Sequence, residues 1–305
     1  MRIRLAHISV CVLLLNFLLG CSPTEPKENE PKIDIDFANI ETIDYSEHVQ
    51  PVFDAYCLSC HGGDKPAADT LYVSGFMVPG GNVPQSVVPI ERSTMTVGDP
   101  IPVLYDIPHG IAISPSGEEL YVASLSSHRI IFIDTQSNDI ESLSLGSSKA
   151  PLQIAVSPDG STLYATAQLS NELFVIDAAT RSIQATLSDG IGLQPWHPVV
   201  TPDGVRVYVG NLTSNSVSVI DANSNTVLQP ITGDGITQPH GSAVTSDGKY
   251  VFISNRNSSG DYVPRHNFGD NENVGTITVI NTETNAITKV LEVGDFATGL
   301  GIWEE

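Results

Sequence analysis

The segment Ala155-Val-Ser-Pro-Asp-Gly160, followed by Leu163-Tyr164-Ala165 and Val175-Ile176-Asp177, decides the fold of this 305-residue chain. Each apolar run has the length of a strand and is bounded by turn residues. In the Ser-Pro-Asp-Gly turn, proline fixes φ, aspartate bonds the local backbone, and glycine accepts a positive φ. The segment therefore predicts three consecutive β-strands.

The same pattern recurs on both sides of this segment. Its copies begin at Ala112, Ala155, Val199 and Ala243, with spacings of 43, 44 and 44 residues, and a weaker apolar run ends each unit. Four strands in a unit of this length are typical of a β-propeller. An acid or amide ends each third strand and is followed three residues later by Ser or Thr. We interpret these residues as turn residues and not as metal ligands: Asp134, Asp177, Asp221 and Asn281.

The repeats resemble the YVTN family of β-propellers, which is named for sequences like those at Tyr121-Val122 and Tyr208-Val209. The resemblance covers residues 108–294 and implies an all-β fold. It implies no particular activity, because propellers host many functions.

The chain ends in an isolated first strand, Gly299-Leu-Gly-Ile-Trp303, which alone would leave a row of backbone groups unpaired. Matches to the second, third and last strands of a repeat occur near the N-terminal end: Leu71-Tyr72-Val73, Ser86–Glu91 and Thr96–Asp99. We therefore expect a five-bladed propeller over residues 71–305, with four clear repeats and a composite closing blade.

An alternative keeps residues 41–106 as a small separate cytochrome domain. Pro89 favours this alternative, because it lies inside a proposed strand and has no N–H for the hydrogen-bond ladder. The segments Met77-Val-Pro-Gly-Gly81 and Ser86-Val-Val-Pro89 also resemble loops of small cytochromes.

Cys57-Leu-Ser-Cys60-His61 has the C-x-x-C-H spacing of covalent c-type haem attachment. The two thiols can add to the haem vinyl groups, and the histidine can supply an axial nitrogen to the iron. A disulfide or half of a zinc site would use the same cysteines, but a zinc site needs a second pair of ligands nearby. The stretch Val49–Gly63 resembles the start of small bacterial cytochrome c domains, so we expect a helical segment over residues 41–70 that carries haem c.

A sixth iron ligand is expected among the methionines. Met95 is the first candidate, because the turn after the third strand of the closing blade should lie on the same side as the haem segment. Met77 is the second candidate. Plain packing is the alternative for both, with His48, water or an open site as the sixth ligand.

Residues 1–20 have the features of a signal peptide, with Arg2 and Arg4 before an apolar run too short to span a bilayer comfortably. Leu18-Leu19-Gly20-Cys21 resembles a bacterial lipobox, which implies lipidation of Cys21 and an anchor in the membrane. An ordinary secretory signal with another cleavage point is the alternative. Residues 21–40, rich in Pro, Glu and Lys, are expected to be an extended tether.

These features place the chain in a bacterial cell envelope, on the periplasmic or outer-surface side of a membrane. Ser22 lacks the aspartate that retains lipoproteins at the inner membrane, which favours the outer membrane. Cys11 leaves with the signal peptide and Cys21 takes lipid, so the mature chain keeps only the motif cysteines.

The mature chain would carry 12 Lys and Arg against 35 Asp and Glu, a formal charge of −23. So acidic a surface disfavours nucleic acid and anionic lipid headgroups. We expect an exported redox partner, and the charge suits a basic one. A saline habitat or a plain solvated acidic surface is the alternative explanation of the charge.

Histidines also gather at the predicted starts of the inner strands. His109 and His240 each occur as Pro-His-Gly, and His197 follows Trp196 at the matching position. These residues should crowd the top of the central channel, where they form a candidate metal or ligand site. A structural role is the alternative. The fourth repeat contains an insertion over Asn255–Asn273.

The sequence thus predicts a membrane-anchored monohaem cytochrome that carries electrons. A haem-dependent enzyme, such as a peroxidase or oxidase, and a protein-binding propeller with a structural haem are the alternatives. No Ser-His-Asp motif, phosphate loop or paired-carboxylate signature is found.

Overall fold

The computed structural model describes residues 70–75, 85–105, 107–266, 274–295 and 297–300. This described part is all-β and contains five four-stranded antiparallel sheets, which confirms the predicted five-bladed propeller. It contains no helix long and apolar enough to cross a membrane. The chain divides into two compact units, residues 1–71 with 90–98 and residues 72–89 with 99–305. The predicted helical haem segment, tether and signal peptide lie outside the described residues.

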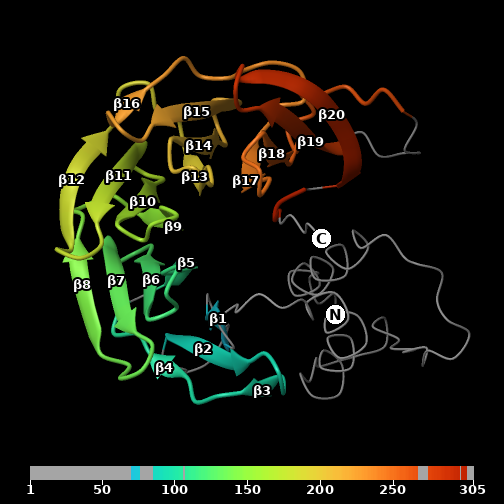
Figure 1. The fold of residues 1–305 in the computed structure, drawn as a ribbon. Coiled ribbons are helices and arrows are strands. Elements are labelled where there is room, and N and C mark those ends of the chain that lie inside the picture. The colour runs from blue at the N-terminus through green and yellow to red at the C-terminus, as the bar shows by residue number, and fades with distance from the viewer. Residues whose placement is uncertain (1–69, 76–84, 106, 267–273, 296, 301–305) are drawn as a thin grey trace, which may run out of the picture. The chain divides into compact units, whose positions relative to one another are not determined.

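Four blades of the second unit follow one another in the sequence. Each blade is a meander whose first strand is innermost and whose fourth is outermost (Figure 1). The inner strands of consecutive blades contact one another around a common centre. The first blade comprises β5 (Pro108–Ile113), β6 (Glu119–Ser124), β7 (Arg129–Asp134) and β8 (Ile140–Ser144). The second comprises β9 (Pro151–Val156), β10 (Thr162–Ala167), β11 (Glu172–Asp177) and β12 (Ser182–Leu187).

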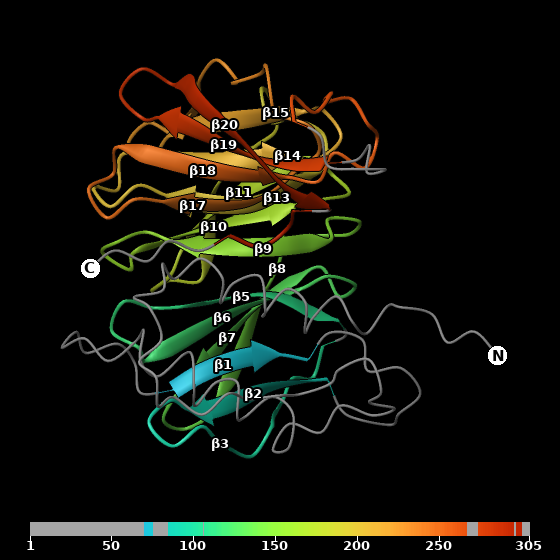
Figure 2. The ribbon, with the colours of Figure 1, turned by 90° about the vertical axis from the view of Figure 1, so that its right-hand side faces the viewer.

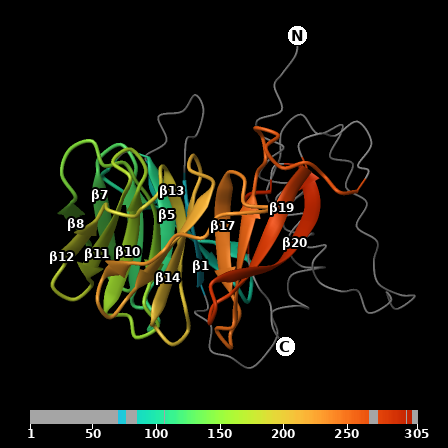
Figure 3. The ribbon, with the colours of Figure 1, turned by 90° about the horizontal axis from the view of Figure 1, so that it is seen from above.

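The third and fourth blades differ from the first two at their outer strands. The third comprises β13 (Pro195–Val200), β14 (Arg206–Asn211), β15 (Ser216–Asp221) and a two-residue β16 (Thr226–Val227). The fourth comprises β17 (Pro239–Val244), β18 (Tyr250–Asn255), β19 (Val274–Asn281) and a ten-residue β20 (Ala286–Asp295). Figure 2 shows β17 to β20 side by side as one twisted sheet, and Figure 3 shows β20 beside β19. The insertion lies between β18 and β19, within the bounds that the sequence predicted.

The turns form as their residue types predicted. In the second blade Gly160 has a φ of 76°, and its N–H donates to the carbonyl of Ser157 at 2.8 Å. The carboxylate of Asp159 accepts from the hydroxyl of Ser157 and from the N–H of Ser161. The residues that end the third strands also accept backbone N–H groups of their own turns, at Asp134, Asp177, Asp221 and Asn281. The interpretation of these four as turn residues is confirmed.

Apolar side chains fill the spaces between neighbouring blades. Tyr121 and Phe132 of the first blade meet edge to face with centroids 5.7 Å apart, and they pack with Leu163 and Phe174 of the second. Equivalent clusters join the second blade to the third and the third to the fourth. Each fully buried side chain of this size contributes about 1.5–3 kcal/mol to stability, so blade-to-blade packing holds the second unit together.

The fifth sheet comprises β1 (Thr70–Ser74), β2 (Ser86–Glu91), β3 (Thr96–Val97) and β4 (Ile101–Pro102). The short strands β3 and β4 both pair with β2, at Ile90↔Val97 and Val87↔Ile101. Pro89 lies between these two pairings, where β2 needs no N–H for an outer partner. This interruption explains how a proline fits within β2. Val87 and Ile101 pack with Leu120 and Val122 of the first blade.

The C-terminal segment takes the place of the inner strand that the fifth sheet lacks. The carbonyl of Thr298 accepts from Nδ1 of His240 at 3.2 Å, as the carbonyl of Leu152 accepts from Nδ1 of His109 at 3.0 Å. The segment at Thr298 therefore lies beside β17 in the way that β9 lies beside β5, which is the position of the next inner strand. Residues 301–305 lie outside the described residues.

The second strand of the fifth sheet shows the same equivalence. The hydroxyl of Ser74 in β1 donates to the carbonyl of His109 at 2.7 Å. The hydroxyl of Ser254 in β18 donates to the carbonyl of Thr298 at 2.6 Å. Because β18 is a second strand, β1 holds the second-strand position of its blade, as the composite closing blade requires.

Candidate functional site

Most of the predicted haem and lipid residues lie outside the described residues. They are Cys21, Cys57, Cys60, His61 and Met77. Met95 is described, and its location in the turn between β2 and β3 agrees with the sequence prediction.

Met95 is unusual within its turn. It has a φ of 53° and is 5% exposed, whereas Thr94 and Thr96 on either side are exposed. It belongs to none of the four apolar clusters formed by the described residues. A buried thioether that packs into none of these clusters remains a candidate sixth ligand.

The starts of the inner strands form a second site, on a backbone that repeats from blade to blade. Each inner strand begins with proline, and a residue with positive φ precedes it: Ile107, Ala150, Gln194 and Gln238. In each blade the carbonyl of that residue accepts a hydrogen bond from the backbone N–H of the residue just after the second strand. These donors are Leu125, Gln168, Leu212 and Arg256. The backbone is therefore constant here, while the side chains differ between blades.

Side chains at the starts of the inner segments gather in one cluster with Arg256, the residue just after β18. We call it the central cluster and define it as His109, Trp196, His197, His240, Arg256 and Thr298. The rings of Trp196 and His240 lie 3.9 Å apart between centroids, and those of His197 and His240 lie 5.0 Å apart. The rings of His109 and Trp196 meet edge to face, with their centroids 6.3 Å apart. The guanidinium carbon of Arg256 lies 4.9 Å from the centroid of the same indole. The three predicted histidines are therefore brought together.

Backbone carbonyls orient each imidazole of the central cluster. Nδ1 of His109 and Nδ1 of His240 donate to carbonyls of the next inner segment, and His197 donates to the backbone of His240. In a neutral imidazole the other nitrogen then carries a lone pair.

The electrostatics of the cluster keep these imidazoles neutral. Burial comes first, followed by repulsion from a neighbouring histidine and from Arg256, and together they lower the pKa of His197 to about 4 and that of His240 to about 2. Burial also lowers the pKa of His109, and lowers that of Arg256 to about 10. At neutral pH the cluster therefore contains one cation and three neutral imidazoles.

Three inner segments of the central cluster each carry a buried polar atom that has no hydrogen-bond partner among the described residues. The atoms are Nε1 of Trp196, Nε2 of His240 and Oγ1 of Thr298. All three belong to the same register position of successive inner segments. Buried polar groups are normally paired, so this concentration is a feature of the site.

The residues described contain no group of three or more His, Cys, Asp or Glu arranged to hold a metal. The sequence did not single out Arg256 or Thr298. Aligning the residues that follow each second strand would have exposed Arg256, because the other blades have Leu125, Gln168 and Leu212 there.

The insertion is fastened to β20 by Glu292, another residue that the sequence did not single out. Its side chain is 5% exposed and accepts from the hydroxyl of Tyr262 at 2.8 Å, from the backbone N–H of Arg265 and from the ring of His266. Burial raises the pKa of Glu292, but these hydrogen bonds outweigh it and lower the pKa to about 2.

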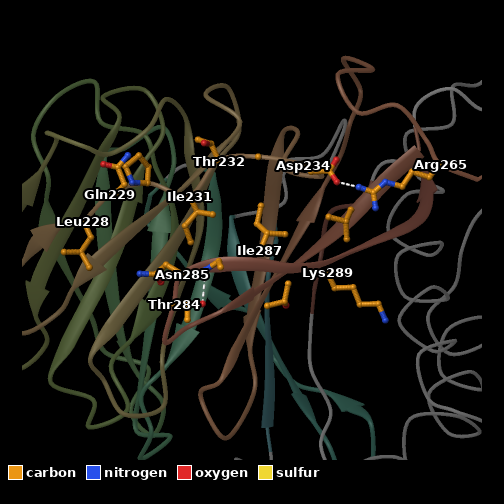
Figure 4. A pocket seen from close by; sticks show the side chains of 15 residues that line it. Leu228, Gln229, Ile231, Thr232, Asp234, Arg265, Thr284, Asn285, Ile287 and Lys289 are labelled. Carbon is orange, nitrogen blue, oxygen red and sulfur yellow. Dashed lines mark hydrogen bonds and ion pairs between the residues drawn. The ribbon is translucent and has the colours of Figure 1, made fainter.

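A groove of about 950 Å³ runs between the connection after β16 and the edge strand β20 (Figure 4). It is lined by residues 228–234 and 284–290 with Arg265, which forms an ion pair with Asp234. No predicted site residue lines it.

No family model and no curated protein matches the chain. Solved structures do resemble it. Hydrazine synthase of Kuenenia stuttgartiensis is 18% identical with a TM-score of 0.53, and the match covers 72% of this chain and 53% of that one. A functionally unknown protein from Desulfotomaculum acetoxidans is 16% identical with a TM-score of 0.58, covering 76% and 69%.

A 6-phosphogluconolactonase candidate from Bacteroides uniformis is 14% identical, with a TM-score of 0.58 and coverage of 76% of this chain and 71% of that one. This chain spans about half the length of the hydrazine synthase chain. At such low identities the likeness shows a shared fold and carries no activity over to this chain.

Proposed function

We propose that this protein is an exported, lipid-anchored monohaem c-type cytochrome, in which the propeller is a rigid scaffold for electron transfer. The observation that carries the proposal is Cys57-Leu-Ser-Cys60-His61 downstream of an export signal. The lipobox at Cys21 supports the same compartment, because c-type haem is attached on the far side of the bacterial inner membrane.

The donor set fits haem. Two thiols and an imidazole follow one another in the order that covalent attachment needs, and Met95 offers a buried thioether outside the four apolar clusters. Haem would supply one-electron redox chemistry. The acidic surface would serve docking, because opposite charge on a partner speeds encounter, which favours a basic exported partner.

The test is expression of the full chain in a bacterium with a working cytochrome c maturation system. We expect haem to stay with the polypeptide after denaturation and acid extraction, and the protein to show a reversible redox midpoint. The Cys57→Ala, Cys60→Ala variant should lose the pigment and keep the fold. Pigment that extracts into the organic layer from the wild-type protein would refute the proposal.

The spectrum also separates the electron carrier from the haem enzyme. A carrier should be six-coordinate and low-spin, and unaffected by peroxide or cyanide. A high-spin iron that reacts with peroxide would replace electron carriage with catalysis.

A further inference from the structure

We infer that the central cluster is a binding site for a small oxyanion that also carries a hydroxyl group, such as an α-hydroxycarboxylate. The inference goes beyond electron transfer and does not depend on haem. It rests on the unpaired polar atoms, the charge of the cluster and the contrast between blades.

The unpaired atoms specify a ligand with both kinds of hydrogen-bonding group. Nε1 of Trp196 can only donate, Nε2 of His240 can only accept while its ring is neutral, and Oγ1 of Thr298 can do either. A carboxylate alone would satisfy the donor and leave the acceptor unpaired. A hydroxyl beside the carboxylate satisfies both. Each buried group left unpaired costs about 1–3 kcal/mol, so a ligand gains from every one of these atoms that it pairs.

The charge of the cluster favours an anion over a metal ion. Arg256 is the one cation of the cluster at neutral pH, and its positive charge lowers the pKa of both His197 and His240. A metal cation at the lone pair of His240 would meet this positive field, whereas an oxyanion would be attracted by it. This positive centre stands out in a chain whose formal net charge is −21.

The contrast between blades argues against a purely structural role. Leu152 holds the same register position in the second blade, and the backbone there makes the same hydrogen bonds. The fold therefore accepts an apolar side chain at this position. The imidazoles of His109 and His240 bond the next inner segment through Nδ1. That role leaves Nε1 of Trp196, Nε2 of His240 and Oγ1 of Thr298 unexplained, and a ligand explains them.

Calorimetric titration of the mature, full-length protein with glycolate tests the inference. Acetate, which lacks the hydroxyl, is the matched probe. We expect one glycolate per chain and binding of acetate at least about tenfold weaker, the factor that about 1.4 kcal/mol represents. The Cys57→Ala, Cys60→Ala chain should bind glycolate as the wild type does, which separates this inference from the haem proposal.

Three variants locate the site. Trp196→Phe keeps an aromatic ring without its N–H, His240→Asn keeps a donor for the carbonyl of Thr298, and Arg256→Gln removes the charge. Each should weaken glycolate binding about tenfold or more. His266→Asn, which changes an exposed histidine outside the cluster, should leave the affinity unchanged.

A crystal of the wild-type protein soaked in glycolate guards against misfolded variants, and should show the ligand against Trp196 and His240. No heat of binding at millimolar glycolate, equal affinity for acetate, unchanged binding in Trp196→Phe and His240→Asn, or only water at the cluster would each overturn the inference.

Discussion

The hydroxyl of Ser254 donates to the carbonyl oxygen of Thr298 at 2.6 Å and so ties the C-terminal segment to the fourth blade. Ser254 is 1% exposed, so in Ser254→Ala the carbonyl oxygen of Thr298 loses this hydrogen bond where water cannot easily replace it. We expect a loss of about 1–3 kcal/mol in the free energy of unfolding, measured by urea denaturation. Ser259→Ala, at an exposed serine that bonds Asp261, should change stability little. Equal losses in the two variants would argue against this closing contact.

Close approach of the same segment explains a glycine in β17. A Cβ on Gly241 would overlap the carbonyl oxygen of Thr298 and lie 2.8 Å from Oγ of Ser254. Gly241→Ala should therefore destabilise the protein by about 1–3 kcal/mol. Gly294→Ala is the control, because a Cβ there meets nothing within 4 Å. Thermal unfolding followed by circular dichroism compares the two, and a similar midpoint for both would show that the C-terminal segment yields easily.

Besides Glu292, the buried side-chain amide of Asn257 holds the insertion. Nδ2 of Asn257 donates to the carbonyls of Tyr262 and Val274, each at 3.0 Å, and Asn257 is fully buried. Asn257→Asp keeps the acceptor and the tolerance for positive φ, but loses both donors and buries a carboxylate. We expect trypsin to cleave after Arg265, whose side chain is 57% exposed, several times faster than in the wild type.

The control for that experiment is Asn285→Asp. Asn285 also has a positive φ, and the contact described for its side chain uses the acceptor oxygen, which receives the hydroxyl of Tyr208. Its cleavage rate should match the wild type. Equally fast cleavage in both variants would mean that the donors of Asn257 do not hold the insertion.

The sequence predicted the scaffold well because each blade is encoded locally. The turn at Ser157–Gly160 needs only its own side chains, and the bounds of the insertion follow from the repeat period. The central cluster was predicted only in part. The Pro-His-Gly motifs, with Trp196-His197 at the matching position, indicated its histidines, whereas Arg256 and Thr298 meet them only after separate blades pack together. Leu152 is the second residue of its inner strand, as Trp196 and His240 are of theirs, yet an apolar residue there does not indicate that the matching residues of other blades form a site. The outer strand of the third blade is also shorter than the period suggests.

The neutral histidines of the central cluster predict a pH dependence of stability. The pKa of His240 is about 2 and that of His197 about 4 in the folded protein, against about 6.5 in the unfolded chain. As the pH falls through 6.5, the unfolded state binds protons that the folded state cannot, so stability falls. The maximum slope is about 1.4 kcal/mol per pH unit for each histidine.

Urea denaturation between about pH 7.5 and pH 5.5 measures this slope, before most carboxylates begin to bind protons in the unfolded chain. His240→Asn should flatten it by the contribution of one histidine. A wild-type stability that is flat over this range would show that the imidazoles take up protons in the folded state.

Substituting each methionine in turn distinguishes between Met95 and Met77 as the sulfur ligand of the proposed haem. A thioether bound to ferric haem gives a weak charge-transfer band in the red, and methionine ligation raises the reduction potential. Met95→Leu conserves side-chain volume, so it should cost less than about 1.5 kcal/mol in stability while abolishing the band and lowering the potential. Met77→Leu should leave both unchanged. If Met77→Leu alone abolishes the band, the ligand is Met77, and the burial of Met95 serves packing. If the wild-type protein itself shows no such band, neither methionine is the ligand, and the sixth position belongs to His48 or to solvent. Met77 and Met95 are the only methionines of the mature chain.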